Sequence, residues 1–167
     1  AATKVARYSA AKQNPDGSWY YGELPTQHWI DNFHTGFNLV ALKSIGEYGA
    51  TSEFRDYINR GLEFYLSNFF TKDGAPKYFH DSLYPIDIHC VAQSIITLVE
   101  FKDNEHVNMR VAQSVLNWAM DHMWDDRGFF YFQKRRYYTI RTPFMRWSQA
   151  WMLLALAMLA NAAPGEG

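Results

Sequence analysis

The sequence contains three similar segments, repeated at a period of about 55 residues. An Asp/Gly turn with aromatic side chains is followed by a polar or proline-marked helix start and then by an apolar helix. The turns lie at 15–21, 72–79 and 125–132, and the helix starts follow at 29–39, 84–93 and 142–151. A repeat of this length corresponds to one supersecondary unit, so the period constrains the architecture before any single motif is considered.

Composition narrows the class of protein further. A chain of 167 residues suits one domain, and 48% hydrophobic residues can form a core. The net charge of −1 argues against nucleic-acid binding by electrostatics. The single cysteine, Cys90, excludes an internal disulfide and fits either a reducing compartment or a fold that needs no disulfide, and we expect a cytoplasmic protein. The apolar run 150–160 is too short to span a bilayer, and we expect no membrane span.

Apolar residues recur at helical spacing in six segments. The predicted helices are 3–12, 31–47, 53–70, 86–101, 105–124 and 144–162. Ser52 and Asn104 are the predicted caps of the third and fifth helices, whereas Pro85 and Pro143 open the fourth and sixth. The helices at 53–70 and 105–124 carry charge on one side. Those at 86–101 and 144–162 are apolar nearly all round, which predicts that other helices enclose them.

The alternation of charged and apolar helices predicts an all-α fold, an α/α toroid built from three helical hairpins. We expect one domain over residues 1–167, with repeats at about 1–48, 52–101 and 104–162. The longer connections run from outer to inner helix, and such connections on one side of a scaffold often carry function. The polar first turns of the inner helices are expected to face the same mouth.

Several segments resemble a known superfamily. Gln13–Trp19 has the Q-x3-G-x-W form of the repeat in triterpene cyclases. Residues 60–66, followed by 73–74, resemble a degenerate second copy that lacks the Gln and the Trp. The chain as a whole resembles the terpenoid-cyclase/protein-prenyltransferase α/α toroids. Trp19–Leu42, which contains WIDNFHTGF, looks most like the VpsJ-like proteins of bacterial exopolysaccharide clusters. This resemblance implies a bacterial protein that handles carbohydrate in polysaccharide biosynthesis.

The number of hairpins departs from that superfamily, whose closed toroids contain five to seven. Three hairpins leave three possibilities: the sequence is half of a longer chain, two copies close the ring as a homodimer, or the array stays open. We expect half of a larger α/α barrel.

Asp31 and His34 form the first candidate catalytic pair. Asp31 is at the start of an inner helix, where a carboxylate caps free N–H groups, and this structural role alone accounts for it. A spacing of three places both side chains on one helical face, so Asp31 can also orient His34 for general acid/base work.

Asp87 and His89 occupy the matching turn of the second inner helix. Neighbouring inner helices lie about 8–10 Å apart, so the two Asp/His pairs can meet. The plainer interpretation is again an N-cap with a hydrogen-bonded histidine. The segment from His34 also resembles faintly the His-Thr-Cys-Tyr of zinc-dependent prenyltransferases. With Cys90 available, zinc is an open alternative, although we expect no cofactor and assign no metal ligand.

The third repeat replaces the acidic turn with a basic, aromatic one. Arg141 and Arg146 are predicted to hold an anionic group such as a uronate, unless their stems merely pack on aromatic rings. The predicted stacking surfaces for sugar rings are Tyr20, Tyr21, Trp29, Tyr84 and Trp147.

These features support three functional hypotheses. The first is acid/base chemistry on a sugar or uronate, of epimerase, lyase or hydrolase type, with a carbohydrate ligand that is acidic if the arginines bind it. The second is a non-catalytic helical-repeat scaffold, in which the Asp and His residues only satisfy helix ends. The third is isoprenoid handling. The sequence contains no Asp-x-Asp-Asp acid motif, and this counts against terpene cyclisation.

Overall fold

The computed structural model describes residues 1–162, which form helical hairpins with small strands in the connections. The helices are α1 (Ala2–Ala11), α2 (Asn32–Tyr48), α3 (Arg55–Asn68), α4 (Ile88–Glu100), α5 (Met109–Met123) and α6 (Ala150–Ala162), with the short helix η1 (Pro25–Gln27) and the π-helical segment η2 (Met145–Gln149). The all-α expectation is confirmed, and each predicted helix is present.

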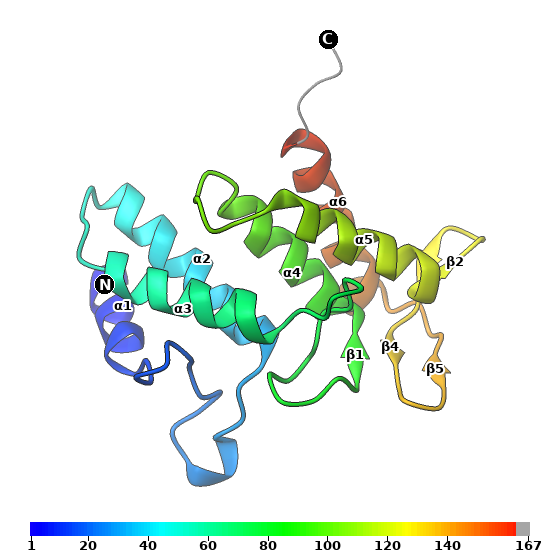
Figure 1. Ribbon diagram of the computed structural model, residues 1–167, viewed down its shortest axis with the longest axis horizontal. Coiled ribbons are helices and arrows are strands. Elements are labelled where there is room, and N and C mark those ends of the chain that lie inside the picture. Colours follow the sequence, from blue (N-terminus) through cyan, green and yellow to red (C-terminus); the bar gives the residue numbers. More distant parts are fainter. Residues whose placement is uncertain (163–167) are drawn as a thin grey trace.

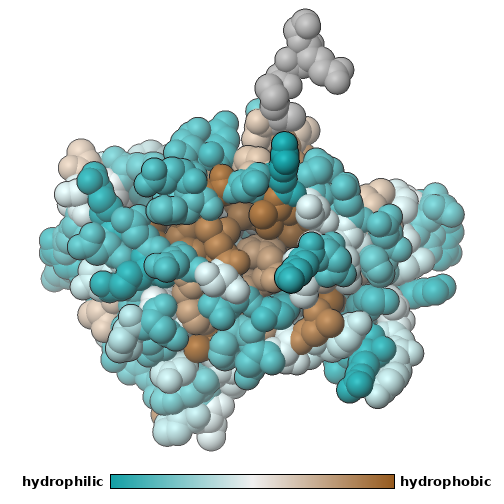
Figure 2. Space-filling model, in the orientation of Figure 1, coloured by the Kyte–Doolittle hydropathy of each residue, from teal (hydrophilic) through white to brown (hydrophobic). Residues whose placement is uncertain are grey.

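Figure 1 shows α3 and α5 on the near side of the molecule, with α2 and α4 behind them. Helix α4 packs against α2, α5 and α6. Every residue from Ile88 to Val99 is buried, as its apolar composition predicts. The outward face of α3 and α5 is largely hydrophilic, and apolar side chains are visible in the hollow between them (Figure 2).

The three long connections, 12–31, 69–87 and 124–149, gather on one side of the array (Figure 1). They contain strands of two residues each: β1 (Ile86–Asp87), β2 (Trp124–Asp125), β3 (Phe129–Phe130), β4 (Gln133–Lys134) and β5 (Thr139–Ile140). All pairings are antiparallel, in the orders β1-β4-β5 and β2-β3. The β1–β4 pair joins the second long connection to the third.

Three predicted helix starts are wrong. Ser52 and Asn104 lie in turns before α3 and α5: the Ser52 carbonyl accepts a bond from the Arg55 N–H, and Asn108, not Asn104, caps α5. Pro85 precedes strand β1 and does not open α4, which Asp87 caps. At α4 and α5 a second polar residue closer to the helix, Asp87 or Asn108, is the cap, whereas α3 begins after Phe54 with no side-chain cap.

Helix α6 is the second departure from expectation. Its apolar surface was predicted to be enclosed, but Leu153 is 71% exposed, while Met152 and Ala155 are buried against α4. The described hairpins cover only one side of α6. No helix within residues 1–162 is both long and apolar enough to cross a membrane.

Candidate active site

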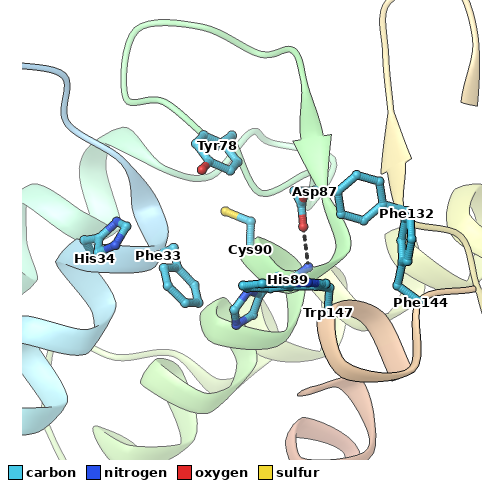
Figure 3. A pocket seen from close by; sticks show the side chains of 9 residues that line it. All are labelled: Phe33, His34, Tyr78, Asp87, His89, Cys90, Phe132, Phe144 and Trp147. Carbon is cyan, nitrogen blue, oxygen red and sulfur yellow. Dashed lines mark hydrogen bonds between the residues drawn. The ribbon is translucent and has the colours of Figure 1, made fainter. Parts of the chain in front are cut away.

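A cavity of about 540 Å³ opens beside the N-terminal ends of α2 and α4, a size typical of small-molecule sites. We call it the histidine cavity. Figure 3 shows its lining: Phe33, His34, Tyr78, Asp87, His89, Cys90, Phe132, Phe144 and Trp147. Three of the four predicted catalytic residues, His34, Asp87 and His89, therefore line one cavity, and the fourth, Asp31, is in contact with it through His34.

Helix capping positions these side chains. Asp31 and Asp87 both have extended backbones, and each carboxylate accepts a bond from a first-turn amide: the His34 N–H at 2.8 Å and the His89 N–H at 2.9 Å. Caps of this kind satisfy N–H groups that have no partner within the helix. The structural role considered for both aspartates is thus present, and it directs the two histidines toward the cavity.

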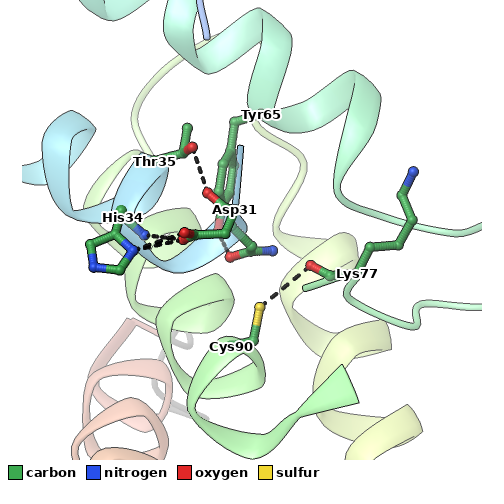
Figure 4. Close-up of polar contacts among 7 residues, drawn as sticks. Asp31, His34, Thr35, Tyr65, Lys77 and Cys90 are labelled. Atoms are coloured by element: carbon green, nitrogen blue, oxygen red, sulfur yellow. Dashed lines mark hydrogen bonds and ion pairs between the residues drawn. The ribbon is translucent and has the colours of Figure 1, made fainter. Parts of the chain in front are cut away.

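Asp31 also holds the imidazole of His34. Nδ1 of His34 lies 2.9 Å from both carboxylate oxygens, as Figure 4 shows. An ionised carboxylate only accepts hydrogen bonds, so Nδ1 carries the proton and Nε2 is left as the basic nitrogen. The Asp31 side chain is buried, whereas that of His34 is partly exposed. The pair therefore presents one oriented base to the cavity.

His89 is in an aromatic surrounding on the other side of the cavity. Its ring centroid lies 3.9 Å from that of Phe33 and 4.5 Å from that of Trp151. Burial, with the charge of the nearby His34 as a second cause, lowers the pKa of His89 to about 4. The imidazole is therefore neutral at pH 7. Although His89 is only 8% exposed, its buried Nε2 has no hydrogen-bond partner among residues 1–162.

Asp87 is a buried carboxylate with an unusual proton affinity. Burial raises its pKa to about 6, and the bonds from the His89 N–H and the Gln133 side chain oppose that rise. Gln133 Nε2 donates to Asp87 Oδ2 at 3.3 Å because the β1–β4 pair places the two residues opposite each other. Asp87 therefore takes up a proton near pH 6.

Tyr78 and Cys90 line the cavity as protonated groups at neutral pH. Burial, with the charge of Asp31 as a second cause, raises the pKa of Tyr78 to about 12. Burial likewise raises the pKa of the Cys90 thiol, which donates to the Lys77 carbonyl oxygen at 3.4 Å (Figure 4). Within the part of the chain that the structure describes, no three His, Cys, Asp or Glu side chains are grouped so that they could hold a metal ion.

The structure places some of the predicted sugar-stacking residues near the histidine cavity. Trp147 lines it. Tyr21 stacks on Trp29 with centroids 4.5 Å apart, and its ring meets His34 edge-on at 4.7 Å. Tyr20 lies in a neighbouring cavity, where it stacks on His28.

The remaining predicted ligand residues lie elsewhere. Tyr84 packs against the hydrophobic core between the second and third hairpins. Arg141 is exposed and lies over the ring of Tyr131, and Arg146 faces a separate cavity beside α6. No Arg or Lys side chain lines the histidine cavity within the described residues.

Five lining residues were not among the predicted site residues: Phe33, Tyr78, Cys90, Phe132 and Phe144. The repeat contained a signal for one of them, because Tyr78 occupies the place in the second aromatic turn that Tyr20 and Tyr21 occupy in the first. The three phenylalanines carried no such signal, since an aromatic residue in a turn or at a helix start is most often a packing residue.

No protein-family model and no curated protein matches the sequence. Among solved structures, the chain is similar to cellobiose 2-epimerase from Bacillus thermoamylovorans B4167, with a TM-score of 0.76 and 11% identity. The fold is an α/α toroid. The likeness covers 96% of this chain but only 48% of that one, so this chain spans about half the length of the epimerase. The resemblance to the exopolysaccharide-cluster proteins stays a prediction.

Proposed function

We propose that this protein binds a carbohydrate in the histidine cavity and carries out acid/base chemistry on it, of the epimerase type. The observation that carries the proposal is His89 Nε2, a buried nitrogen without a partner, in the same cavity as the Asp31-held imidazole of His34. A buried polar atom left unpaired costs about 1–3 kcal/mol, which a bound hydroxyl or carbonyl group would recover.

The two histidines suit a proton transfer at a carbon next to a carbonyl group. His89, which is neutral, removes the proton from that carbon and leaves an enediolate, and His34 in its imidazolium form returns a proton to the opposite face. Proton exchange of both histidines with water then restores their starting forms. The product is the epimer, with no net oxidation and no other reactant. Asp31 stabilises the imidazolium form of His34 through Nδ1. The Tyr78 hydroxyl stays protonated and can donate to the oxygen that gains negative charge.

The carboxylates fit a hydrolase less well. Glycoside hydrolysis uses two carboxyl groups that both face the scissile bond. Asp31 is buried and engaged with His34, so only Asp87 remains available in the lining. The lining also has no cationic side chain within the described residues, which favours a neutral sugar over a uronate. The likeness to an epimerase supports epimerase chemistry over hydrolysis at the level of the fold. The resemblance of 19–42 to exopolysaccharide-cluster proteins supports a place in bacterial polysaccharide biosynthesis.

The experiment is proton exchange followed by NMR in D2O, with cellobiose and glucose as probes. We expect deuterium to enter at the carbon next to the anomeric centre. We expect the rate to fall by at least about 100-fold in His34→Ala and in His89→Ala, the scale of a lost general base.

His106→Ala is the matched control, because His106 is an exposed histidine in the turn before α5. Circular dichroism verifies that each variant is folded. If neither probe is bound or exchanged, the proposal fails. Equal rates in folded His34→Ala and His106→Ala would also refute it.

A further inference from the structure

A second cavity, of about 600 Å³, lies between α1 and the connection that leads to α2. We propose that it binds additional sugar residues of a neutral oligosaccharide whose reacting residue occupies the histidine cavity. This inference rests on the proposed function. We call the second cavity the distal cavity; its lining includes Lys12, Tyr20, Tyr21, Glu23, His28 and Asn38.

The two cavities lie next to each other at the start of α2. Tyr21 lines the distal cavity, and its ring contacts His34, which lines the histidine cavity. Asn38 follows His34 by four residues on α2, so the two side chains lie one helical turn apart on the same face. A chain of linked sugars can therefore extend from one cavity into the other.

Aromatic rings form the exposed surface of the distal cavity. Tyr20 stacks on His28 with centroids 4.2 Å apart, and Tyr21, which also lines the cavity, stacks on Trp29 outside the lining. Tyr20 and Tyr21 are each 45% exposed, and Trp29 is 39% exposed. Large rings held in fixed stacks yet open to solvent offer flat apolar surfaces with polar edges, which match the apolar faces and hydroxyl groups of a sugar.

The charged side chains Lys12 and Glu23 of the distal cavity pair with each other, so the cavity has almost no net charge. Lys12 Nζ lies 3.2 Å from Glu23 Oε1, and the Tyr8 hydroxyl donates to the same carboxylate. The amide of Asn38 adds a donor and an acceptor beside this pair. Hydroxyl groups suit such a surface better than a charged group, because a charged ligand would compete with the Lys12–Glu23 pair.

The connection that carries the rings is fixed at both ends. Trp19 is buried at its base, where its Nε1 donates to the Ser9 carbonyl oxygen at 2.8 Å. Further along, the Tyr21 N–H donates to the Trp29 carbonyl oxygen at 2.9 Å and closes the loop between them. A surface that is already ordered loses little conformational freedom when it binds a ligand.

The test measures dissociation constants by calorimetry for glucose, cellobiose and cellotriose. In the unaltered protein we expect the dissociation constant for cellotriose to be about 3- to 10-fold lower than that for glucose, the scale of one or two aromatic contacts. Tyr20→Ala and Asn38→Ala should bring this ratio close to 1. Tyr48→Ala is the control, because Tyr48 is a 94% exposed tyrosine at the other end of α2.

The outcomes separate the two proposals. If affinity does not depend on chain length, or if Tyr20→Ala and Tyr48→Ala show the same ratio, the distal cavity is not a sugar site. Proton exchange that still depends on His34 would leave the proposed function standing in that case. If none of the three sugars binds, both proposals fail.

Discussion

Asp87 and His89 lie two residues apart at the start of α4, and their protonation should affect stability in opposite directions. Burial raises the pKa of Asp87 from 3.8 to about 6 and lowers that of His89 from 6.5 to about 4. Each shift of roughly two units corresponds to about 3 kcal/mol, as an upper figure because both groups border a cavity that water can enter.

The sign follows from which state binds the proton more tightly. Asp87 binds a proton more tightly in the folded than in the unfolded state. Its protonation therefore stabilises the folded state at low pH, and this stabilisation is lost as pH rises from about 4 to 6. His89 binds a proton less tightly in the folded than in the unfolded state. Its contribution to folded-state stability is therefore present above pH 6.5 and is lost as pH falls toward 4. Over this window the two contributions nearly cancel.

Single substitutions should reveal each contribution. Asp87→Asn keeps a capping side chain, since Asn caps helices as well as Asp does. Relative to the unaltered protein, its free energy of unfolding should increase by up to about 3 kcal/mol between pH 4 and 6. His89→Phe keeps an aromatic ring against Phe33 and Trp151, and its relative free energy of unfolding should decrease by a similar amount over the same range.

Urea unfolding followed by tryptophan fluorescence at pH 4, 5, 6 and 7 measures these differences. Subtracting the curve of the unaltered protein removes the contributions of all other groups. Asp81→Asn is the control, because Asp81 is an exposed carboxylate in the same connection. Difference curves for Asp87→Asn and His89→Phe that are flat, or that slope in the same direction, would refute the assignment of burial as the dominant cause.

Two further predictions concern helix packing, both measured by urea unfolding. Gly36→Ala should destabilise the protein by about 1–3 kcal/mol, because a Cβ at Gly36 would lie 2.6 Å from Thr97 Oγ1 on α4. Gly46→Ala on the same helix should cost less, because a Cβ there would meet only the Thr51 carbonyl oxygen, at 3.3 Å. Met152→Ala should lower the free energy of unfolding by about 2–5 kcal/mol, because Met152 is buried. Its neighbour Leu153 is exposed, so Leu153→Ser should change that free energy by less than about 0.5 kcal/mol. Equal effects in either pair would contradict the packing described for α4 and α6.

Much of the architecture was predictable because it depends on local pattern. Helical spacing of apolar residues identified all six helices, and the repeat identified Asp31 and Asp87 at equivalent helix starts. The errors at Ser52 and Asn104 concern helix ends, because a helix can begin at any of several nearby residues and only the surrounding packing selects one.

The site was predictable only in part. His34 and His89 were identified as a possible pair from their positions in the repeat, and the structure places both in one cavity. Arg141 and Arg146 were expected at the same mouth, but they lie outside the lining. The position of a residue in the repeat predicts which connection or helix start carries it. Which cavity its side chain faces depends on how the long connection folds.

The sequence by itself determined the helices, the polar turns that begin the inner helices and the capping aspartates, because these depend on residues within one or two turns of each other. Only the tertiary structure decided that His89 Nε2 is buried without a partner and that Leu153 on α6 is exposed. Burial depends on which distant segments pack against a side chain: Phe33 and Trp151 surround His89 from positions more than 50 residues away on either side. That long-range packing gives a histidine at a helix start the environment of a candidate catalytic group.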